Sequence, residues 1–383
     1  MIQFADWTKN LSPSAMQRSL QVGDLSQYIS FALGLPDEST LPSEFCSSFK
    51  FAQHNLQYSP TNHLLKTHIT KIMKKRGVKC KEDEIFITSG AQQGISLLTR
   101  LLSNEGDNVL VENLSYPGFI QAAQASRINL IPILTNYNNG ISLEDLTKQI
   151  RLSNKKPSFI YIVSDGSNPL GNSLTIEKRK QLIDLSLQYN IPIVEDDPYG
   201  LLYYEQNYPA LKAYNNDNIC YVGSFSKVIA PSLRVGWIVI PYHLINKLSI
   251  LKESLDINTQ TLSQKIVLEF LAQNKFESHL INIRNLYKRK RDHMINSFYT
   301  NLQDKITLYK PNNGICLWIK FHNNYAKEIF NKASEKKILF IPGSDFCVID
   351  NIEIANDCAR FNFSHCKLDD ISKGIEILSN IIT

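Results

Sequence analysis

The sequence predicts an α/β protein with a large domain, in which helices flank a mostly parallel central sheet, and a smaller α/β domain at the C-terminus. Three observations carry this prediction. Short apolar segments rich in Val and Ile alternate with amphipathic segments of helical length between residues 85 and 195. Polar residues directly follow several of the apolar segments. A second, shorter alternation of the same kind begins near residue 314.

Composition places the chain among ordinary globular proteins. Hydrophobic residues make up 43% and charged residues 20% of its 383 residues, and the net charge of +5 is a mild excess for this length. The densest basic run, Lys288–Arg291, lies within an expected amphipathic helix and is interpreted as a solvated helix face. We therefore expect no nucleic-acid partner.

The N-terminal segment and the cysteines indicate a cytoplasmic protein. Asp6 and Lys9 stand where a secretion signal needs an apolar run, and no apolar run approaches the length that spans a membrane. The seven cysteines include no C-x-x-C pair, which predicts reduced thiols. We expect no membrane contact and no bound metal.

The chain divides by pattern into three parts. Residues 1–45 are expected to form an N-terminal arm, residues 46–284 the large domain and residues 285–383 the small domain. The arm ends in an extended piece, Ile29–Pro36, in which Gly34 either allows a close backbone approach or simply forms a turn.

Residues 46–80 are helical by pattern, with a break at Tyr58–Thr61, and residues 85–102 predict a strand, a small polar turn and a helix. The turn contains Gly90, Ala91 and Gln92. Free backbone amides and the helix dipole favour an anion at such a turn. Neither G-x-G-x-x-G nor a Walker lysine is present, so a dinucleotide or nucleoside triphosphate is not indicated. A plain strand-to-helix turn is the alternative.

The large domain continues with strands at 108–112, 130–134, 159–164 and 191–195, and with helices from 117 and at 143–150 and 175–189. Apolar strands separated by helices are typical of a parallel sheet that is covered on both faces. Polar residues gather after two of these strands, at Asn168–Gly171 and Asp196–Tyr199. The carboxyl ends of the strands are where such sheets build their sites.

The most informative stretch lies between two apolar runs, at 219–222 and 235–240, and carries four polar residues: Ser224, Ser226, Lys227 and Arg234. A lysine at a strand end, with two hydroxyls before it and an arginine after it, suits a carbonyl cofactor that also bears a phosphate. The amine forms a Schiff base, while the hydroxyls and the guanidinium hold the dianion. A solvated loop with an ordinary cation is the alternative.

A long helical region at 241–299 precedes the small domain. The remaining pattern predicts strands at 314–319, 338–342 and 359–363, and helices at 325–334 and 368–382.

In this order the segments resemble the fold-type I pyridoxal-5'-phosphate enzymes, in particular the class I and II aminotransferases and, among them, the 2-aminoadipate and kynurenine aminotransferase group. The resemblance covers nearly the whole chain, from Ser30–Pro36 to Ala359–Ser364. Its most specific part is G-S-F-S-K at 223–227, followed by A-P-S-L-R-V-G-W at 230–237. It implies transfer of an amino group from an L-amino acid to a 2-oxo acid by a ping-pong mechanism.

The resemblance also implies roles for individual residues. Lys227 would form the Schiff base and carry a proton between the substrate Cα and the cofactor C4', and Asp196 would keep the pyridine nitrogen protonated. Tyr199 and Asn168 would lie near the ring oxygen O3'. A positive ring nitrogen makes the cofactor an electron sink, so a buried carboxylate is needed beside it.

The remaining implied residues surround the phosphate and the substrate. Those expected at the phosphate are Gly90, Ala91, Gln92, Ser224, Ser226 and Arg234. Tyr116 would stack on the ring, and Tyr58 would reach the phosphate of a neighbouring subunit, which implies a homodimer with shared sites. Arg360 would clamp the substrate α-carboxylate, beside Asn168 and Gly34. An internal salt bridge from Arg360 to Asp357 is the alternative.

The sequence departs from the family pattern in places. Ser164 and Ser167 replace the usual Pro and Gln, Ala91 stands where a hydroxyl residue is common, Ser232 replaces a frequent glycine, and the turn after Tyr58 is shorter. We expect specificity to have changed in the substrate-facing arm and in the dimer-facing turn.

Two other functions fit parts of the pattern. The same cofactor site could catalyse β-elimination or decarboxylation, since the cofactor stabilises whichever carbanion the protein orients. A non-catalytic amino-acid sensor is a rival of another class, against which stand the complete set of cofactor residues and the lack of a helix-turn-helix pattern before residue 30.

Overall fold

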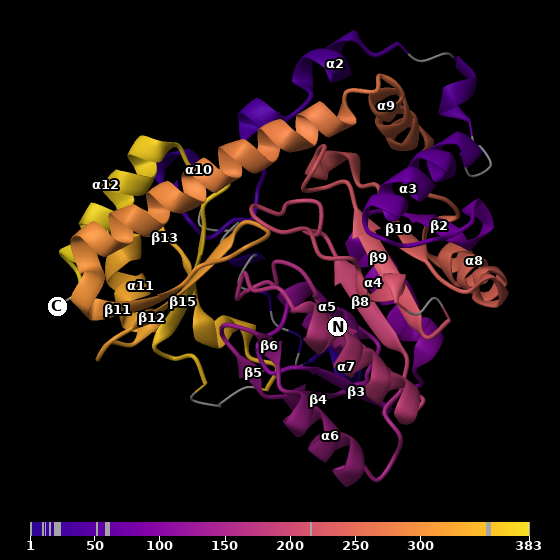
Figure 1. Cartoon of the computed structure of the whole chain (residues 1–383), viewed down its shortest axis with the longest axis horizontal. Coiled ribbons are helices and arrows are strands. Elements are labelled where there is room, and N and C mark those ends of the chain that lie inside the picture. Colours follow the sequence, from indigo (N-terminus) through magenta and orange to yellow (C-terminus); the bar gives the residue numbers. More distant parts are fainter. Residues whose placement is uncertain are drawn as a thin grey trace.

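The computed structural model describes residues 2–9, 11, 13–14, 17–18, 24–50, 53–57, 62–214, 217–349 and 354–382. Two larger sheets organise this part of the chain, and helices pack around them (Figure 1). All seven cysteines are unpaired thiols, as expected. Among the helices of the described residues, none combines the length and the apolar composition that crossing a membrane requires.

Seven strands form the central sheet: β2 (Ile85–Thr88), β3 (Asn108–Glu112), β4 (Asn129–Ile133), β7 (Ile160–Ile162), β8 (Ile193–Asp197), β9 (Ile219–Ser224) and β10 (Gly236–Val239). They lie in the order β2, β10, β9, β8, β7, β3, β4. The pairs from β9 to β4 are parallel, whereas β10 runs antiparallel to both β2 and β9. The predicted α/β fold with a mostly parallel sheet is confirmed.

Helices cover both faces of this sheet: α4 (Ala91–Leu102), α5 (Pro117–Ala125) and α8 (Tyr242–Asp256) on one, and α3 (His63–Lys75), α6 (Leu143–Leu152) and α7 (Ile176–Gln188) on the other. Side chains alternate between the faces because successive strand residues point in opposite directions. In β3, Val109 and Val111 pack with α4 and α5, while Leu110 packs with α6 and α7. Nearly continuous apolar strands follow from burial on both sides.

Strand β8 begins and ends two residues later than the sequence pattern suggested. The pattern ended the strand at Glu195, but its pairing with β9 continues through Asp196 and Asp197, opposite Val222 and Gly223. Acidic residues are rare inside strands, so the pattern placed them in a turn. Their buried hydrogen bonds allow the ladder to continue. This places three consecutive acids inside the sheet.

The second sheet consists of four strands in the order β11 (Ile306–Tyr309), β12 (Cys316–Phe321), β15 (Cys358–Asn362) and β14 (Ile341–Pro342). It packs with α11 (Ala326–Glu335) and α12 (Leu368–Ser379). The sequence pattern missed β11, a four-residue strand in which Ile306 is buried, Thr307 is exposed and the last two residues are partly buried. Two short pieces lie beside the larger sheets: the hairpin of β5 (Thr135–Asn136) and β6 (Gly140–Ile141), and β1 (Ile29–Ser30), which pairs with β13 (Ile338–Leu339).

The long helical region predicted after residue 241 consists of three helices: α8, α9 (Thr261–Ala272) and α10 (Phe276–Leu302). The longest, α10, extends across the molecule from the neighbourhood of α9 to the four-stranded sheet (Figure 1). The predicted domain boundary at 284/285 therefore falls inside a continuous helix. A short helix, α2 (Ser43–Ser48), spans the predicted end of the arm at residue 45.

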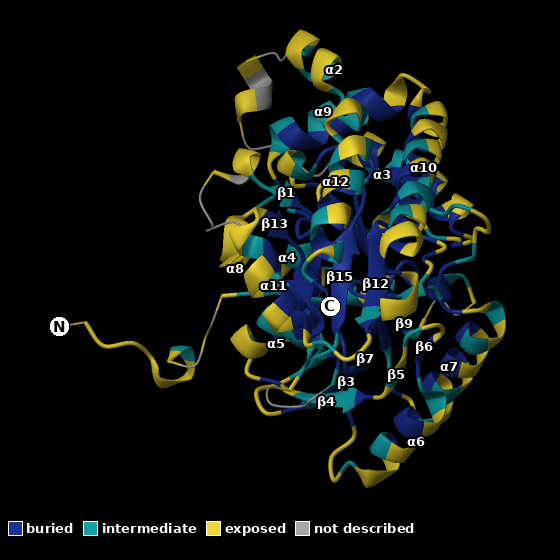
Figure 2. Cartoon of the chain, turned by 90° about the vertical axis from the view of Figure 1, so that its left-hand side faces the viewer, coloured by how far each residue is buried: buried dark blue, intermediate teal, exposed yellow. Residues whose placement is uncertain are grey.

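Most strand residues are buried, whereas the described residues at the N-terminus are mostly exposed to solvent. The strands of both sheets are mostly buried, whereas the first residues extend away from the body of the molecule (Figure 2). Ile2, Phe4 and Trp7 are exposed by 100%, 80% and 42%, respectively. A segment this rich in apolar side chains is well suited to pack against another surface.

Candidate active site

A cavity of about 320 Å³ opens at the carboxyl ends of β8 and β9, where the arm and β15 face them. It is lined by Leu33, Gly34, Leu35, Ala91, Gln92, Tyr116, Val163, Asn168, Asp196, Pro198, Tyr199, Ser224, Ser226, Lys227, Pro231, Arg234 and Arg360. The structure thus brings together, from segments far apart in sequence, nearly all of the predicted site residues. Gly90 lies directly behind the lining, against Arg234. Tyr58 lies outside the described residues.

Asp196 is a buried carboxylate with one free oxygen. Its Oδ2 accepts a hydrogen bond of 2.7 Å from the Tyr161 hydroxyl, while its Oδ1 has no hydrogen-bond partner among the described residues. Burial raises the pKa of Asp196 to about 7, and the neighbouring Asp197 and Glu195 add to this effect, whereas the bond from Tyr161 opposes it. An unpaired buried oxygen is costly, so a cationic donor in the cavity would be bound favourably here.

Lys227 follows β9 and reaches back across the cavity to the arm. Its Nζ donates a hydrogen bond of 2.7 Å to the carbonyl oxygen of Gly34. Burial lowers the pKa of Lys227 to about 8, with a further contribution from the positive charges of Arg360 and Arg234, while Cys316 opposes the shift. A lysine with this pKa is neutral in a useful fraction of molecules near neutral pH and can act as a nucleophile or base.

The β2–α4 turn and Arg234 form a positively polarised cup. Gly90 caps α4 with a φ of +82° and provides no side-chain cap, so the first amides of the helix are open to an anion. A side chain at this φ would be strained, and its Cβ would lie 2.4 Å from Nη2 of Arg234, so the guanidinium would have to move. Arg234 contacts Oγ of Ser226 and the carbonyl oxygen of Ser89, each at 3.4 Å.

Arg360 lies on β15 and is 5% exposed. Its Nη1 donates to Asn168 Oδ1 at 3.1 Å and its Nη2 donates to the carbonyl oxygen of Ala32, but Nε is buried and has no partner within the described part of the chain. Asp357, the alternative partner, instead pairs with Lys320 at 3.2 Å. A buried guanidinium without a carboxylate is suited to receive one from a ligand.

Comparison with known proteins identifies the family. Residues 38–378 match the family model of aminotransferase class I and II. The chain belongs to this family. An aromatic-amino-acid aminotransferase of Thermococcus litoralis is 30% identical over 99% of this chain and 94% of its own, and a 2-aminoadipate transaminase of Thermus thermophilus is 26% identical over 99% and 96%. The crystal structure of a Pyrococcus horikoshii kynurenine aminotransferase, solved with PMP, superposes with a TM-score of 0.91 at 30% identity, covering 99% of this chain and 96% of that one.

The chain is therefore a pyridoxal 5'-phosphate-dependent aminotransferase with the fold-type I architecture. Transcriptional regulators of the helix-turn-helix type are also relatives. One from Staphylococcus aureus is 32% identical, and the match covers 73% of this chain and 63% of the regulator. The aminotransferases match over nearly their full length, and this favours the enzyme over the sensor alternative.

The residues present in the aminotransferase fit its cofactor. The free Oδ1 of Asp196 suits a protonated ring nitrogen, the amine of Lys227 with its lowered pKa suits a carbonyl carbon, and the cup at Gly90 suits a phosphate dianion. Tyr116 lines the cavity before α5, and burial raises its pKa to about 12, so it remains a neutral phenol. Tyr199 is also buried in this wall, and burial raises its pKa well above the ordinary value.

Sequence reasoning missed two residues that complete the site of the aminotransferase. Tyr161 supports Asp196, and Cys316 lies 4.0 Å from Asn168 Oδ1 and close enough to Lys227 to influence its pKa. A role for Tyr161 could have been predicted, because a tyrosine in an apolar strand needs a hydrogen-bond partner for its hydroxyl. Cys316 gave no such signal, since an isolated cysteine in a strand is usually an apolar core residue.

A second cavity of about 170 Å³ adjoins the first and shares Gln92, Tyr116, Asn168 and Arg360 with it. The other lining residues are Ser14, Pro117, Gly118, Gln121, Ile341 and Phe346. Arg360 is the single charged residue among those described as lining it. The second cavity thus extends from the guanidinium into a neutral, partly aromatic space.

Proposed function

We propose that Lys227, Asp196 and Arg360 are the central residues of amino transfer in this enzyme. The observation that carries the proposal is that one cavity holds a partly buried amine, a buried carboxylate with a free oxygen and a buried guanidinium with a free N–H. These three groups come from β8, the segment after β9, and β15. Each is costly to bury alone, and together they match a cationic ring, a carbonyl and a carboxylate.

Pyridoxal 5'-phosphate, when bound, joins the amino group through a Schiff base and withdraws electrons from Cα. Asp196 would hold the proton of the ring nitrogen with its free oxygen, while Tyr161 fixes the other oxygen. A cation beside Asp196 favours its ionised form against the effect of burial. Asn168, Tyr199 and Tyr116, which line the cavity, would hold the ring.

Lys227 would accept a proton at Nζ from the substrate Cα and deliver it to C4' of the cofactor. Its lowered pKa lets the free amine act as a base near neutral pH. The bond from Nζ to the Gly34 carbonyl places the amine close to the arm, and Leu33 and Leu35 on the same segment line the cavity and exclude water. The α-carboxylate of an L-amino acid binds Arg360 through Nε and one terminal nitrogen.

The second cavity takes the side chain of the amino donor. Its volume is close to the ~150 Å³ of an engineered cavity that admits benzene, so it has room for about one ring. Beyond Arg360, the described residues that line it include no second cation for a distal carboxylate. The nearby Arg18 is already paired at 3.0 Å with Asp345, which precedes the lining residue Phe346. We therefore expect uncharged, ring-sized side chains to be preferred over 2-aminoadipate. The names of the aromatic and kynurenine aminotransferases among the relatives support this preference.

The enzyme acts as a homodimer in the cytoplasm, with Tyr58 reaching the phosphate of the partner subunit. Exposed apolar side chains support an interface: Phe4 and Trp7 in the extended segment, and Ile250 and Ile257 on α8 and directly after it. The three-part division into an arm and two domains belongs to the same proposal, since the cavity lies where residues of all three parts meet.

The experiment is a panel of amino acids with 2-oxoglutarate or pyruvate as acceptor, followed by mass spectrometry of the products. Transfer predicts a new amino acid and a new 2-oxo acid in equal amounts, and only when an acceptor is present. Ammonia or carbon dioxide released without an acceptor would establish elimination or decarboxylation instead. Faster turnover of 2-aminoadipate than of phenylalanine would contradict the proposed side-chain preference.

The variant Arg360→Lys tests recognition of the α-carboxylate in the same panel. Lysine cannot reproduce the planar pair of donors, so kcat/KM should fall for every amino acid and every oxo acid by about 1–3 kcal/mol of transition-state stabilisation. Arg127→Lys, on the exposed surface, is the matched control and should leave the panel unchanged. Unchanged kcat/KM in Arg360→Lys would remove Arg360 from the site.

A further inference from the structure

The turn that forms the anion cup is held from behind by the C-terminal end of α8. Ser89, immediately before Gly90, donates from its hydroxyl to Asp256 Oδ2 at 2.8 Å and from its backbone N–H to Gln93 Oε1 at 2.8 Å. Gln93 Nε2 donates to the same Asp256 oxygen at 2.8 Å. Lys252 Nζ donates to Gln93 Oε1 at 2.9 Å and to Asp256 Oδ1 at 2.5 Å. We call Ser89, Gln93, Lys252 and Asp256 the α8 clasp.

The position of Asp256 is unfavourable for the helix that carries it. Asp256 is the last residue of α8, where the negative end of the helix dipole disfavours a carboxylate. Ile257 follows with a φ of +59°, a conformation that β-branched residues rarely adopt. The hydrogen bonds of the α8 clasp offset both costs. A carboxylate kept at such a position indicates that its contacts with the turn matter.

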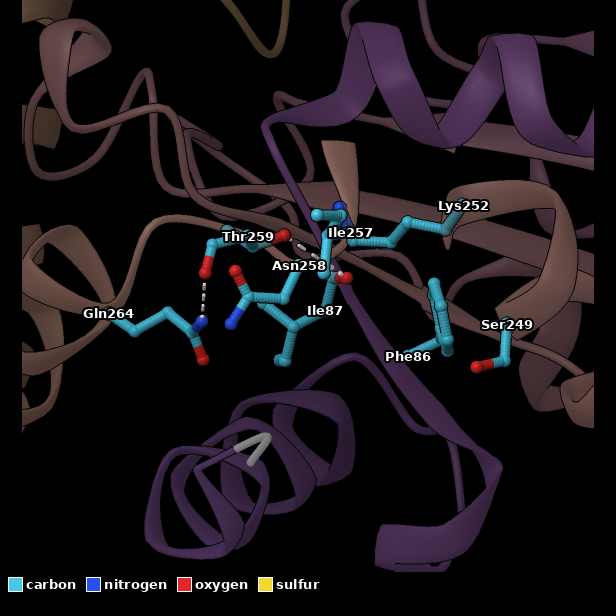
Figure 3. A pocket seen from close by; sticks show the side chains of 8 residues that line it. All are labelled: Phe86, Ile87, Ser249, Lys252, Ile257, Asn258, Thr259 and Gln264. Carbon is cyan, nitrogen blue, oxygen red and sulfur yellow. Dashed lines mark hydrogen bonds between the residues drawn. The ribbon is translucent and has the colours of Figure 1, made fainter. Parts of the chain in front are cut away.

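Lys252 connects the α8 clasp to the interior. It is 4% exposed, and its side chain lies beside a small pocket of about 70 Å³ that Ile257, Asn258, Thr259 and Gln264 also line (Figure 3). Partial burial acts to raise the pKa of Asp256, but hydrogen bonds from Lys252, Gln93 and Ser89 lower it overall. The carboxylate therefore stays ionised at neutral pH and accepts three side-chain donors.

The anion cup depends on the position of Ser89. No side chain caps α4, because Gly90 occupies the N-cap, so the direction of the first helical amides is set by the turn alone. The carbonyl oxygen of Ser89 also contacts Arg234 at 3.4 Å. A shift of Ser89 would therefore displace both the amides and the guanidinium that face the phosphate.

We propose that the α8 clasp positions the phosphate-binding turn for the cofactor, with Asp256 acting through Ser89 and Gln93 as a positioning residue that does not itself touch the cofactor. This inference rests on the proposed cofactor site. It predicts that loss of the carboxylate weakens the binding of the phosphate group and leaves the rest of the cofactor's binding unchanged.

The test uses Asp256→Asn in the full-length chain, stripped of cofactor and titrated with three probes: pyridoxal 5'-phosphate, pyridoxal without the phosphate, and inorganic phosphate. The amide keeps the size of the carboxylate but accepts fewer hydrogen bonds. Because the α8 clasp is partly exposed, we expect Kd for pyridoxal phosphate and for phosphate to rise by about three- to tenfold, and Kd for pyridoxal to stay unchanged. Glu253→Gln, an exposed acid on the same helix, is the matched control and should change none of the three.

A double-mutant cycle with Ser89→Ala sharpens the result. If Asp256 acts through Ser89, the loss of phosphate affinity in the double variant should be smaller than the sum of the losses in the two single variants. An equal loss for pyridoxal and pyridoxal phosphate, with a lower melting temperature, would assign Asp256 a merely structural role and overturn the proposal, as would no loss in either. Failure of the cofactor site itself would be visible separately, since the wild-type chain would then show no preference for pyridoxal phosphate over pyridoxal.

Discussion

The three consecutive acids of β8 show how strand geometry gives neighbouring residues different roles. Asp196 points to the cavity, whereas Glu195 and Asp197 point to the opposite face of the sheet, because side chains alternate along a strand. Asp197 accepts hydrogen bonds from Arg76 and from the Tyr221 hydroxyl, each at 2.8 Å. Its charge is thus neutralised within the protein, and only Asp196 keeps an oxygen for a ligand.

Replacement of these acids by amides should separate catalysis from stability. Asp196→Asn should keep the fold and most of the bound cofactor but lose turnover by on the order of a thousandfold, because an amide cannot hold the ring nitrogen protonated. Asp197→Asn should lower the melting temperature instead, since it leaves Arg76 with a weaker buried partner. Steady-state kinetics and thermal melts of the two variants check this. If the loss of turnover appeared in Asp197→Asn with Asp196→Asn active, our assignment of the ring carboxylate would be wrong.

Residues with a local signal could be predicted from the sequence, and residues that act through distant partners could not. Lys227 and Arg234 stand close together after a strand, so their proximity was visible in the chain. The bond from Tyr161 to Asp196 depends on the pairing of β7 with β8, and the contact from Ser89 to Asp256 joins residues 167 positions apart. Sheet pairing and helix packing bring such residues together, and neither is encoded in a single segment.

At the scale of elements, the end of β3 contains a buried carboxyl that the proposed chemistry does not use. Glu112 is its last residue, and its Oε1 has no hydrogen-bond partner in the described ranges of the chain. Burial raises the pKa of Glu112 to about 8, although Lys178 and a backbone hydrogen bond from Ile141 oppose the shift. The folded protein therefore keeps this proton up to a higher pH than the unfolded chain, in which a glutamate has a pKa of about 4.3.

This carboxyl should make stability depend on pH. Between about pH 4.3 and pH 8 the folded state binds more protons than the unfolded state, so the stability of the fold decreases as the pH rises. The stabilisation from protonated Glu112 is complete below about pH 4.3 and is lost as the pH rises through 8. Glu112→Gln should remove this dependence and stabilise the protein at pH 8 relative to wild type by on the order of a few kcal/mol. Chemical denaturation at pH 5, 6.5 and 8 measures it, with the exposed Glu105→Gln as control. Parallel pH profiles for wild type and Glu112→Gln would refute the assignment.

The apolar pattern predicted the boundaries of strands that are buried on both faces of the sheet. It predicted the boundaries of other strands less well. The central-sheet strands β3, β7 and β9 were predicted because both faces are covered and the apolar runs are continuous. The pattern failed at β8, whose last residues are acids satisfied by tertiary contacts, and at β11, an edge strand with exposed positions. Periodicity reports burial by neighbours, so it weakens where polar partners or solvent replace them.

At the scale of the whole molecule, the cavity exists because three separate segments meet there. The central sheet provides Asp196 and the segment after β9 provides Lys227, β15 of the second sheet provides Arg360, and the arm closes over them with Gly34. The arm is tied to the second sheet by the pairing of β1 with β13 and by hydrogen bonds from Arg360 and Asn362 to its backbone. Movement of the second sheet would therefore carry the arm with it and open the site.

Mixed dimers test whether the active sites are shared between subunits. Lys227→Ala and Tyr58→Ala should each give a weakly active or inactive protein alone. If Tyr58 serves the partner's site, mixing the two chains restores one intact site per heterodimer, because the Lys227→Ala chain still donates its Tyr58 to the functional lysine of its partner. Activity after refolding the mixture, with light scattering for the oligomeric state, is the measurement. No recovery in proven heterodimers, or full activity in a monomer, would contradict the shared site.

The attachment of the cofactor to Lys227 tests the central claim most directly. Reduction of the purified enzyme with sodium borohydride converts a cofactor–lysine Schiff base into a stable bond, and digestion followed by mass spectrometry locates the modified residue. The partly buried amine of Lys227, which lines one cavity with Asp196 and the anion cup, predicts one modified peptide containing Lys227 and its loss in Lys227→Ala. Modification of a different lysine, or of none in an enzyme that still transfers amino groups, would show that the cavity described is not the catalytic centre.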